Sequence, residues 1–122
     1  LLLESGLIPV FPLWKKDSMT LIKEFVNTGF RTIVCAANEE CYQAGILGQT
    51  FDHALLNKVP DGVDPCGENG EFHTFVFDGP IFQKPVSVTL GEVVCKNYDY
   101  SIMEDGASIR KTTAFYFQDI LS

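Results

Sequence analysis

The residues of this chain with the most varied chemistry cluster between positions 64 and 75. These twelve positions hold three carboxylates, a thiol and an imidazole, together with one proline, two glycines and one asparagine. Gly67 and Gly70 can adopt positive φ angles and Asn69 tolerates them, so residues 65–70 are predicted to form a tight polar loop. After this loop, aromatic and β-branched residues predict a strand. Polar loops held at the start of a strand often carry binding and catalytic groups, so we predict the functional centre here.

A thiol beside an imidazole can act as a nucleophile, and the segment contains one such pair, Cys66 and His73. A cysteine and a histidine at this spacing also occur together by chance, and the sequence offers no third group to orient the imidazole. In a strand that begins at Phe72, His73 shares a face with Phe75 and Phe77, which favours a histidine packed among aromatic rings. A cysteine hydrolase is therefore the weaker alternative.

Carboxylates and an imidazole are also metal ligands, and Glu68, Glu71 and His73 offer such a donor set. Their spacing matches no standard metal motif, so no metal site is predicted. Solvated loop carboxylates are the default interpretation. Recognition of a cationic substrate is the more natural functional role, because a fixed ammonium group needs opposite charge or aromatic faces around it.

A second group of polar residues follows the apolar residues 7–13. Lys16 precedes Asp17, and aspartate is a typical N-cap of a helix. If residues 7–13 form a parallel strand, this point lies at the edge where α/β proteins bind ligands, and the amides of the helix start could receive an anion. The cap alone is the favoured alternative. Trp14 could stack on a ring, although core packing is favoured, and Gly48 is by default a turn glycine.

The first third of the chain has the pattern of an α/β sheet. Residues 1–5 resemble a helix tail that ends at Gly6, and residues 7–13 and 30–36 are near-continuous apolar runs typical of buried parallel strands. Between them we predict a helix capped at Asp17 or Ser18 and stopped by Gly29, with an inward face formed by Met19, Ile22, Phe25 and Val26. Because such a sheet needs more than two strands, residues upstream of position 1 are expected.

The rest of the chain has the pattern of mostly antiparallel β structure. After a polar connection at residues 38–49, residues 51–59 are predicted to form a short helix with Phe51, Leu55 and Leu56 inward. The predicted strands are 72–77, 86–94, 98–103 and 109–120, with turns at 78–80 and 104–106 and a link at 96–98. The change of pattern near Asn38 predicts two domains, residues 1–37 and 38–122.

Composition narrows the possible partners. The net charge of −7 argues against nucleic-acid binding by this chain alone and makes it a poor lone site for a polyphosphate. No apolar run is long enough to cross a membrane and no targeting signal is evident, so a cytoplasmic location is expected. The four cysteines have neither C-x-x-C nor zinc-type spacing, which favours free thiols in a reducing compartment.

Residues 62–82 read G-V-D-P-C-G-E-N-G-E-F-H-T-F-V-F-D-G-P-I-F. This string resembles the ATP-dependent diphthine–ammonia ligase (diphthamide synthase) family, a branch of the N-type ATP pyrophosphatases in the adenine nucleotide alpha hydrolase superfamily. The string I-P-V-F-P-L-W at residues 8–14 and the Leu47-Gly48 pair are also similar to that family, and the resemblance covers most of residues 1–92. It implies the end of a parallel, HUP- or Rossmann-like α/β sheet followed by a mostly antiparallel β substrate domain, an architecture between α/β and α+β.

The resemblance further implies a reaction: ATP is cleaved to AMP and pyrophosphate, a carboxylate is activated as an acyl-adenylate, and ammonia attacks to give an amide. The family's S-G-G-K-D-S pyrophosphate loop is absent from this sequence, so ATP and Mg²⁺ are expected to bind mainly to an upstream part, and the fragment alone is expected to be inactive. Carried over by position, the acceptor and adenylate site comprises Gly67, Glu68, Asn69, Gly70, Glu71, His73 and Thr74, with Trp14, Lys16 and Gly48 on the nucleotide side.

The implied acceptor is diphthine on a translation factor, a cationic, trimethylated histidine derivative whose charge Glu68 and Glu71 could hold. Lys15 and Lys16 stand where the family usually has glycine and arginine, and Gln49 stands where arginine is usual. Because neither replacement offers the planar fork of arginine to a phosphate, a different carboxylate acceptor stays open. A homodimer also stays open. The alternative function is a non-catalytic acidic module that binds a cationic peptide or small molecule.

Overall fold

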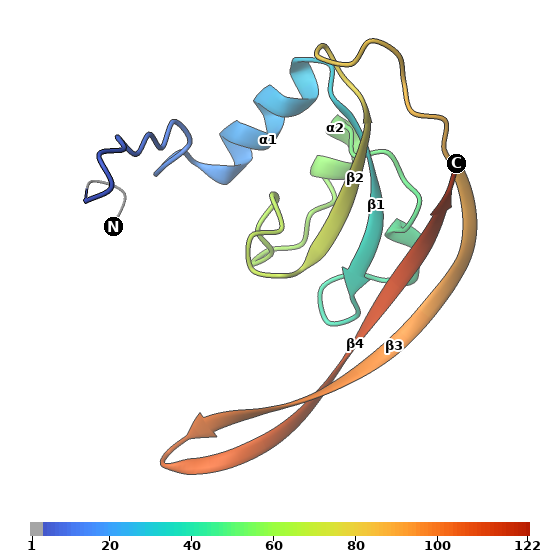
Figure 1. Cartoon of the computed structure of the whole chain (residues 1–122). Helices are drawn as coiled ribbons and strands as arrows, with labels where there is room; N and C mark the ends of the chain where they lie inside the picture. Colours follow the sequence, from blue (N-terminus) through green and yellow to red (C-terminus); the bar gives the residue numbers. More distant parts are fainter. Residues whose placement is uncertain (1–3) are drawn as a thin grey trace.

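The computed structural model describes residues 4–122, except for the side chain of Ala44. Its β structure is one four-stranded sheet in the order β2-β1-β4-β3 (Figure 1). The strands are β1 (Arg31–Asn38), β2 (Phe72–Asp78), β3 (Thr89–Glu104) and β4 (Ala107–Leu121). The pairs β1–β2, β1–β4 and β3–β4 are all antiparallel. The mostly antiparallel β portion is thus confirmed.

The predicted parallel α/β sheet is wrong. Within residues 4–122, residues 7–13 form no strand, and β1 has antiparallel neighbours on both sides. The apolar run in β1 misled the prediction because β1 is the central strand, and Thr32, Ile33, Val34, Ala36 and Ala37 are all buried. A central antiparallel strand covered on both faces gives the same near-continuous pattern as a parallel strand. The predicted helix tail at residues 1–5 falls mainly on residues 1–3, which lie outside the described residues.

Helix α1 (Ser18–Asn27) forms where its sequence predicts it. The carboxylate of Asp17 accepts hydrogen bonds from the backbone N–H and the hydroxyl of Thr20, each at 3.0 Å, which fills the N-terminal cap. These two bonds lower the pKa of Asp17. Gly29, at φ 102°, follows the C-cap and lets the chain turn into β1. The cap prediction is therefore confirmed.

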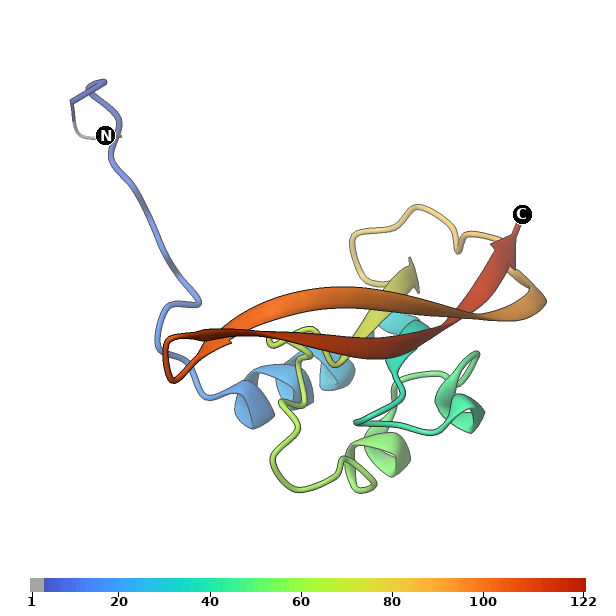
Figure 2. The same cartoon turned by 90° about the horizontal axis from the view of Figure 1, so that it is seen from below.

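The core lies between one face of the sheet and the helical elements, which comprise α1, η1 (Ala44–Ile46) and α2 (His53–Leu56). Figure 2 shows these elements on the same side of the sheet. Phe51, Leu55 and Leu56 are buried as predicted. Helix α2 is shorter than predicted because the amides of Lys58 and Val59 bond to carbonyls three residues back, ahead of Pro60. The core cluster comprises Val34, Ala37, Ile46, Leu47, Phe51, Leu55, Leu56 and Phe72.

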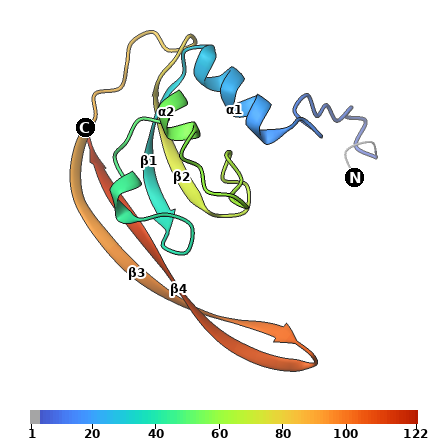
Figure 3. The same ribbon diagram turned by 180° about the vertical axis from the view of Figure 1, so that it is seen from behind.

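Strands β3 and β4 form a long hairpin that projects beyond the rest of the sheet (Figures 1 and 3). Asp105 and Gly106 have φ angles of 51° and 77°, so the predicted turn at residues 104–106 is confirmed as a tight hairpin turn. The predicted link at residues 96–98 is wrong, because Lys96 and Asn97 pair with Phe115 and Ala114 in an unbroken ladder. Polar residues continue this strand because nearly all of β3 is exposed to water. Within residues 4–122, no helix has the length and apolar character needed to cross a membrane.

Candidate functional site

The loop before β2 is folded by its own backbone, as the sequence predicts. The amide of Gly67 donates to the carbonyl of Asp64 at 2.9 Å, and the amide of Gly70 donates to the carbonyl of Gly67 at 3.2 Å. Both glycines have positive φ angles, 69° and 80°. The Asp64 side chain also accepts from the amide of Cys66 at 3.0 Å. These bonds give the exposed Glu68 a defined anchor in an otherwise irregular segment.

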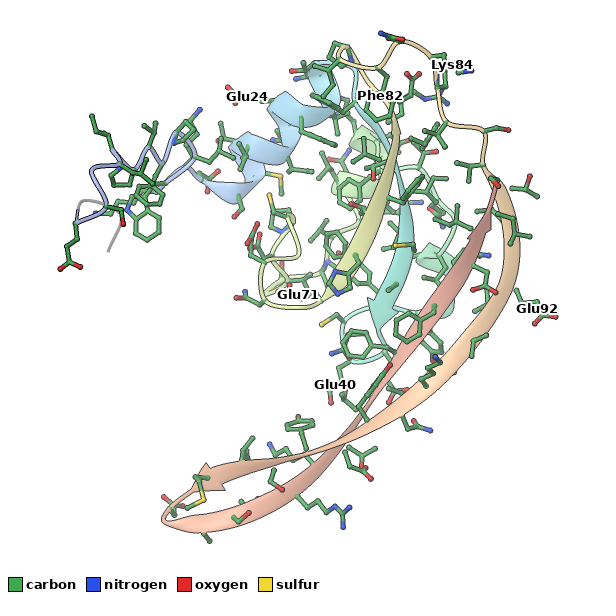
Figure 4. All side chains as sticks on the ribbon, viewed as in Figure 1. Glu24, Glu40, Glu71, Phe82, Lys84 and Glu92 are labelled. Carbon is green, nitrogen blue, oxygen red and sulfur yellow. The ribbon has the colours of Figure 1, made fainter. Side chains whose placement is uncertain are left out.

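The buried carboxylate of Glu71 bonds to the backbone at two points of this loop and holds them together. Its side chain is 6% exposed, and its two carboxylate oxygens accept from the amides of Asp64 at 3.2 Å and Asn69 at 3.0 Å. Its own carbonyl accepts from the amide of Asn38 at the end of β1, at 2.9 Å. Figure 4 shows Glu71 where the loop enters β2. Both oxygens are therefore engaged in holding the loop, whereas the side chain of Glu68 is exposed.

The thiol and the imidazole of the segment do not meet. The Cys66 thiol faces α1 and donates to the carbonyl of Ser18 at 3.3 Å, whereas His73 pairs with Ala36 on the opposite face of the sheet from Phe72. Burial, followed by the nearby carboxylate of Asp64, raises the pKa of the Cys66 thiol. A protonated thiol is a poor nucleophile, so the hydrolase alternative gains no support. All four cysteines are free thiols.

His73 is exposed, so the prediction of a packed histidine is wrong. It lies at an open hollow of about 270 Å³ that it shares with Tyr98, Phe115 and Phe117. The ring centroids of Phe115 and Phe117 are 6.2 Å apart, and Lys96 Nζ lies 5.7 Å from the centroid of Phe117. The rings that share this hollow with His73 thus come from the hairpin, whereas the helical elements of residues 4–122 lie on the other side of the sheet.

Two of the predicted nucleotide-side residues meet the loop. Trp14 and Lys16 line a hollow of about 450 Å³ together with Cys66 and Glu68. Trp14 is 73% exposed, so its predicted packing in the core is wrong. The third residue, Gly48, lies elsewhere: at φ 76°, an added Cβ there would stand 2.8 Å from Leu90 Cδ1.

A second, more apolar hollow of about 370 Å³ lies between α1 and the sheet. Thr74 lines it together with Thr32, Phe72 and Cys66. The hydroxyl of Thr32 is buried without a hydrogen-bond partner. Leu13, Leu21 and Cys66 line both hollows, so the loop, α1 and the segment before it all border the two. In residues 4–122, no three potential metal ligands come close enough together to hold an ion.

Lys15 adopts a left-handed backbone conformation, with φ 62°. Because a side chain in this region costs about 1–2 kcal/mol and glycine adopts it freely, we expect Lys15→Gly to raise the free energy of unfolding by about 0.5–1 kcal/mol after the greater chain entropy of glycine is subtracted. Lys16→Gly is the matched control, because its φ is not positive, and it should lower stability. Chemical denaturation of both variants measures these changes in the free energy of unfolding. If both variants lower it, the expected strain at Lys15 is contradicted.

Sequence reasoning missed Tyr42, which packs edge-on against Phe72 with ring centroids 5.7 Å apart. Its hydroxyl is buried without a hydrogen-bond partner. Burial, with smaller contributions from Cys41 and Glu71, raises the pKa of Tyr42 to about 12. A tyrosine within a polar connection gives little sign of such burial in the sequence.

The neutral phenol of Tyr42 gives the chain a pH-dependent stability. Because the folded pKa lies above the unfolded value, this stability is complete below about pH 10 and is lost as pH rises through about 12. We expect Tyr42→Phe to reduce that alkaline loss and to raise the free energy of unfolding at neutral pH by about 1 kcal/mol, since an unsatisfied hydroxyl is removed. Urea denaturation at neutral and alkaline pH measures both effects. Tyr98→Phe, at a 45% exposed ring, is the control and should keep the wild-type alkaline loss.

The fold and the hollows define a small α+β domain. In it, the glycine-rich loop held by Glu71 faces an apolar segment that precedes the first helix. The chain belongs to the diphthamide synthase C-terminal domain family, whose profile matches residues 17–109. It is 31% identical over 98 residues to a diphthine–ammonia ligase of Danio rerio, covering 75% of this chain and 38% of that protein. A diphthine–ammonia ligase of Bos taurus is 29% identical over 99 residues, covering 77% of this chain and 37% of the relative.

A diphthine–ammonia ligase of Schizosaccharomyces pombe is 32% identical over 93 residues, covering 73% of this chain but only 15% of that protein. The chain therefore spans less than two-fifths of the length of these relatives. The family resemblance seen in the glycine-rich string is confirmed.

Proposed function

We propose that this chain is the acceptor-binding part of an ATP-dependent amide ligase of the diphthine–ammonia ligase type. In the proposed reaction, ATP activates a carboxylate acceptor as an acyl-adenylate and releases pyrophosphate. Ammonia then attacks the acyl carbon, and the bond to AMP breaks to leave an amide. The observation that carries the proposal is that two separate family-like strings, residues 8–14 and 62–82, line one hollow, through Trp14 from the first and Glu68 from the second.

The charges around this hollow suit an acceptor that is cationic at one end and anionic at the other. Glu68 and the exposed ring of Trp14 offer a carboxylate and an aromatic face to an ammonium group. Lys16 offers a cation to the acceptor carboxylate or to the phosphate of an adenylate. In the proposal, the two hydrogen bonds that Glu71 accepts hold the loop and so keep Glu68 in position. The apolar segment before α1 helps to exclude water while ammonia reacts.

The described residues do not fit a triphosphate with its metal ion. Lys15 and Lys16 are the cations that line the hollow, and Glu68 offsets part of their charge. No group of three metal ligands occurs in residues 4–122. The proposal therefore leaves ATP and Mg²⁺ to the part of the relatives' length that this chain does not span, and none of the chain's own residues is given a role in phosphate cleavage.

The test is AMP formation from Mg-ATP by the intact gene product, with and without ammonium and a series of carboxylate acceptors that includes a diphthine-bearing translation factor. We expect AMP to depend on both the acceptor and ammonium. Glu68→Gln removes the charge but keeps the shape, and it should lower kcat/KM for a cationic acceptor by about tenfold or more. Glu40→Gln removes another exposed carboxylate, in the turn at residues 39–41 that follows β1, and is the control.

Each outcome distinguishes the two functions. Acceptor-dependent AMP that falls in Glu68→Gln alone supports the ligase and identifies its acceptor. If folded protein forms no AMP with any acceptor but binds a cationic peptide through Glu68, the acidic binding module takes its place. Equal losses in Glu68→Gln and Glu40→Gln would contradict the assigned role of Glu68.

A further inference from the structure

The hollow of about 370 Å³ between α1 and the sheet, here called the α1 hollow, has the size of a small-molecule site. Residues of α1 line one side of it and residues of β1 and β2 line the other. Figures 1 and 3 show α1 beside β2, the edge strand of the sheet. Since an apolar cavity of about 150 Å³ already holds a benzene ring, the α1 hollow has room for a molecule of one or two rings.

The walls of the α1 hollow are mainly apolar and partly aromatic. Three phenylalanine rings line it, those of Phe25, Phe51 and Phe72. Phe51 and Phe72 are 2% and 5% exposed, and their stacked rings, with centroids 5.4 Å apart, are part of the core. Aromatic rings gain more from face and edge contacts with another ring than their buried area alone provides. A flat ring therefore suits these walls better than a flexible chain.

One polar side chain of the α1 hollow has no partner. Thr32, in the central strand β1, lines the hollow and is 1% exposed, yet its hydroxyl makes no hydrogen bond within residues 4–122. Other polar groups that line the hollow are engaged. The hydroxyl of Thr28 donates to the carbonyl of Glu24 at 2.6 Å. The thiol of Cys66 donates to the carbonyl of Ser18 at 3.3 Å. Because buried polar groups nearly always have a partner, the hydroxyl of Thr32 indicates one that comes from outside the chain.

The hydroxyl of Thr32 suits a ligand better than a water molecule. A buried water needs two to four polar partners, and a hollow in which a neighbouring hydroxyl and a thiol are already engaged offers it few. Rotation about χ1 exchanges the methyl and hydroxyl groups of a threonine, so the hydroxyl can turn toward a group that enters the hollow. A ligand that brings its own polar group needs only this one partner.

We propose that the α1 hollow binds a flat, uncharged molecule of one or two rings that carries one hydroxyl or N–H group. The rings lie among Phe25, Phe51 and Phe72, and the polar group forms a hydrogen bond with the hydroxyl of Thr32. The ligand is uncharged because burying a charge among these rings costs more than one hydrogen bond returns. The inference stands apart from the proposed ligase, since it needs neither a nucleotide nor a carboxylate acceptor.

The test is equilibrium dialysis of the intact gene product, without ATP, against two probes of nearly equal shape. The first, 2-naphthol, carries a hydroxyl group, and the second, naphthalene, carries none. We expect both to bind. Thr32→Val should weaken binding of 2-naphthol by about fivefold or more, because one neutral hydrogen bond is lost, and should change binding of naphthalene less than about twofold. A merely structural role of Thr32 would change both affinities alike.

Two further variants supply the control and the location. Thr113→Val removes the hydroxyl of another buried threonine, 9% exposed, that does not line the α1 hollow, and it should leave both affinities unchanged. Thr74→Phe adds a ring to the hollow from an exposed position of β2 that tolerates aromatic residues, and it should weaken both probes by about tenfold or more. Circular dichroism checks that each variant folds.

Three results would overturn the proposal. The first is that neither probe binds up to its limit of solubility. The second is that Thr32→Val weakens both probes equally or neither of them, which would separate binding from the hydroxyl. The third is unchanged binding in Thr74→Phe, which would place the probes elsewhere on the protein.

Discussion

Glu71→Ala is expected to lower the free energy of unfolding by about 3 kcal/mol, because it removes two hydrogen bonds to a charged acceptor and leaves two amides without a partner. The buried carboxylate accepts from Asp64 on one side of the loop and from Asn69 on the other. Without it, residues 64–70 lose the bonds that join the two ends of the loop. Urea denaturation gives the stability, and amide hydrogen exchange shows whether the loss is local or global.

A second variant of Glu71 separates the effect of its size from the effect of its charge, and a variant of Glu68 is the control. Glu71→Gln keeps the size but offers one oxygen and one NH₂ group, so one loop amide faces a donor and about half of the loss should remain. Glu68→Ala, on the exposed carboxylate of the same loop, should change stability by less than about 0.5 kcal/mol. If Glu68→Ala lowered the free energy of unfolding and Glu71→Ala did not, the two acids would have roles opposite to those assigned here.

These two acids show how far sequence reasoning reaches at the site. Turn chemistry predicted the loop correctly, since Gly67 and Gly70 both adopt the positive φ angles expected of them. Turn chemistry could not tell an exposed carboxylate from one that accepts hydrogen bonds from the loop backbone, because both are acids in a polar loop. Only the fold decides, by placing Glu71 where β1 and β2 meet and exposing Glu68. A carboxylate that lies between a glycine turn and a strand is therefore a sequence pattern that indicates a carboxylate bonded to the loop backbone.

The errors in the fold have a related cause. Local signals set α1 correctly, because Asp17 and Gly29 act on their own neighbours. Strand partners are not local. The apolar residues 30–36 predicted burial correctly but could not say whether the covering strands run parallel or antiparallel. The same limit applies to His73, whose aromatic neighbours Phe115 and Phe117 come from a strand more than forty residues later in the chain. The predicted division into residues 1–37 and 38–122 stays a prediction.

Gly67→Ala is expected to cost about 3 kcal/mol, of which about 1 kcal/mol is left-handed strain and the rest is a steric clash. An added Cβ would stand 2.9 Å from the Phe72 carbonyl oxygen and 3.2 Å from its ring. That ring cannot easily move, because it stacks on the buried Phe51 with centroids 5.4 Å apart and receives the edge of Tyr42. The loop must therefore shift away from β2, and Glu68 shifts with it.

Gly70→Ala is the matched control, because Gly70 has a similar φ of 80° but an added Cβ would meet nothing within 4 Å. It should show the conformational cost alone, about 1 kcal/mol. The difference between the two variants in chemical denaturation measures the contact between the loop and the core. In the proposed ligase, Gly67→Ala should also weaken use of a cationic acceptor more than Gly70→Ala does, because only the first displaces Glu68. Equal losses of stability would show that the close approach to Phe72 does not hold the loop, and that the bonds to Glu71 alone position it.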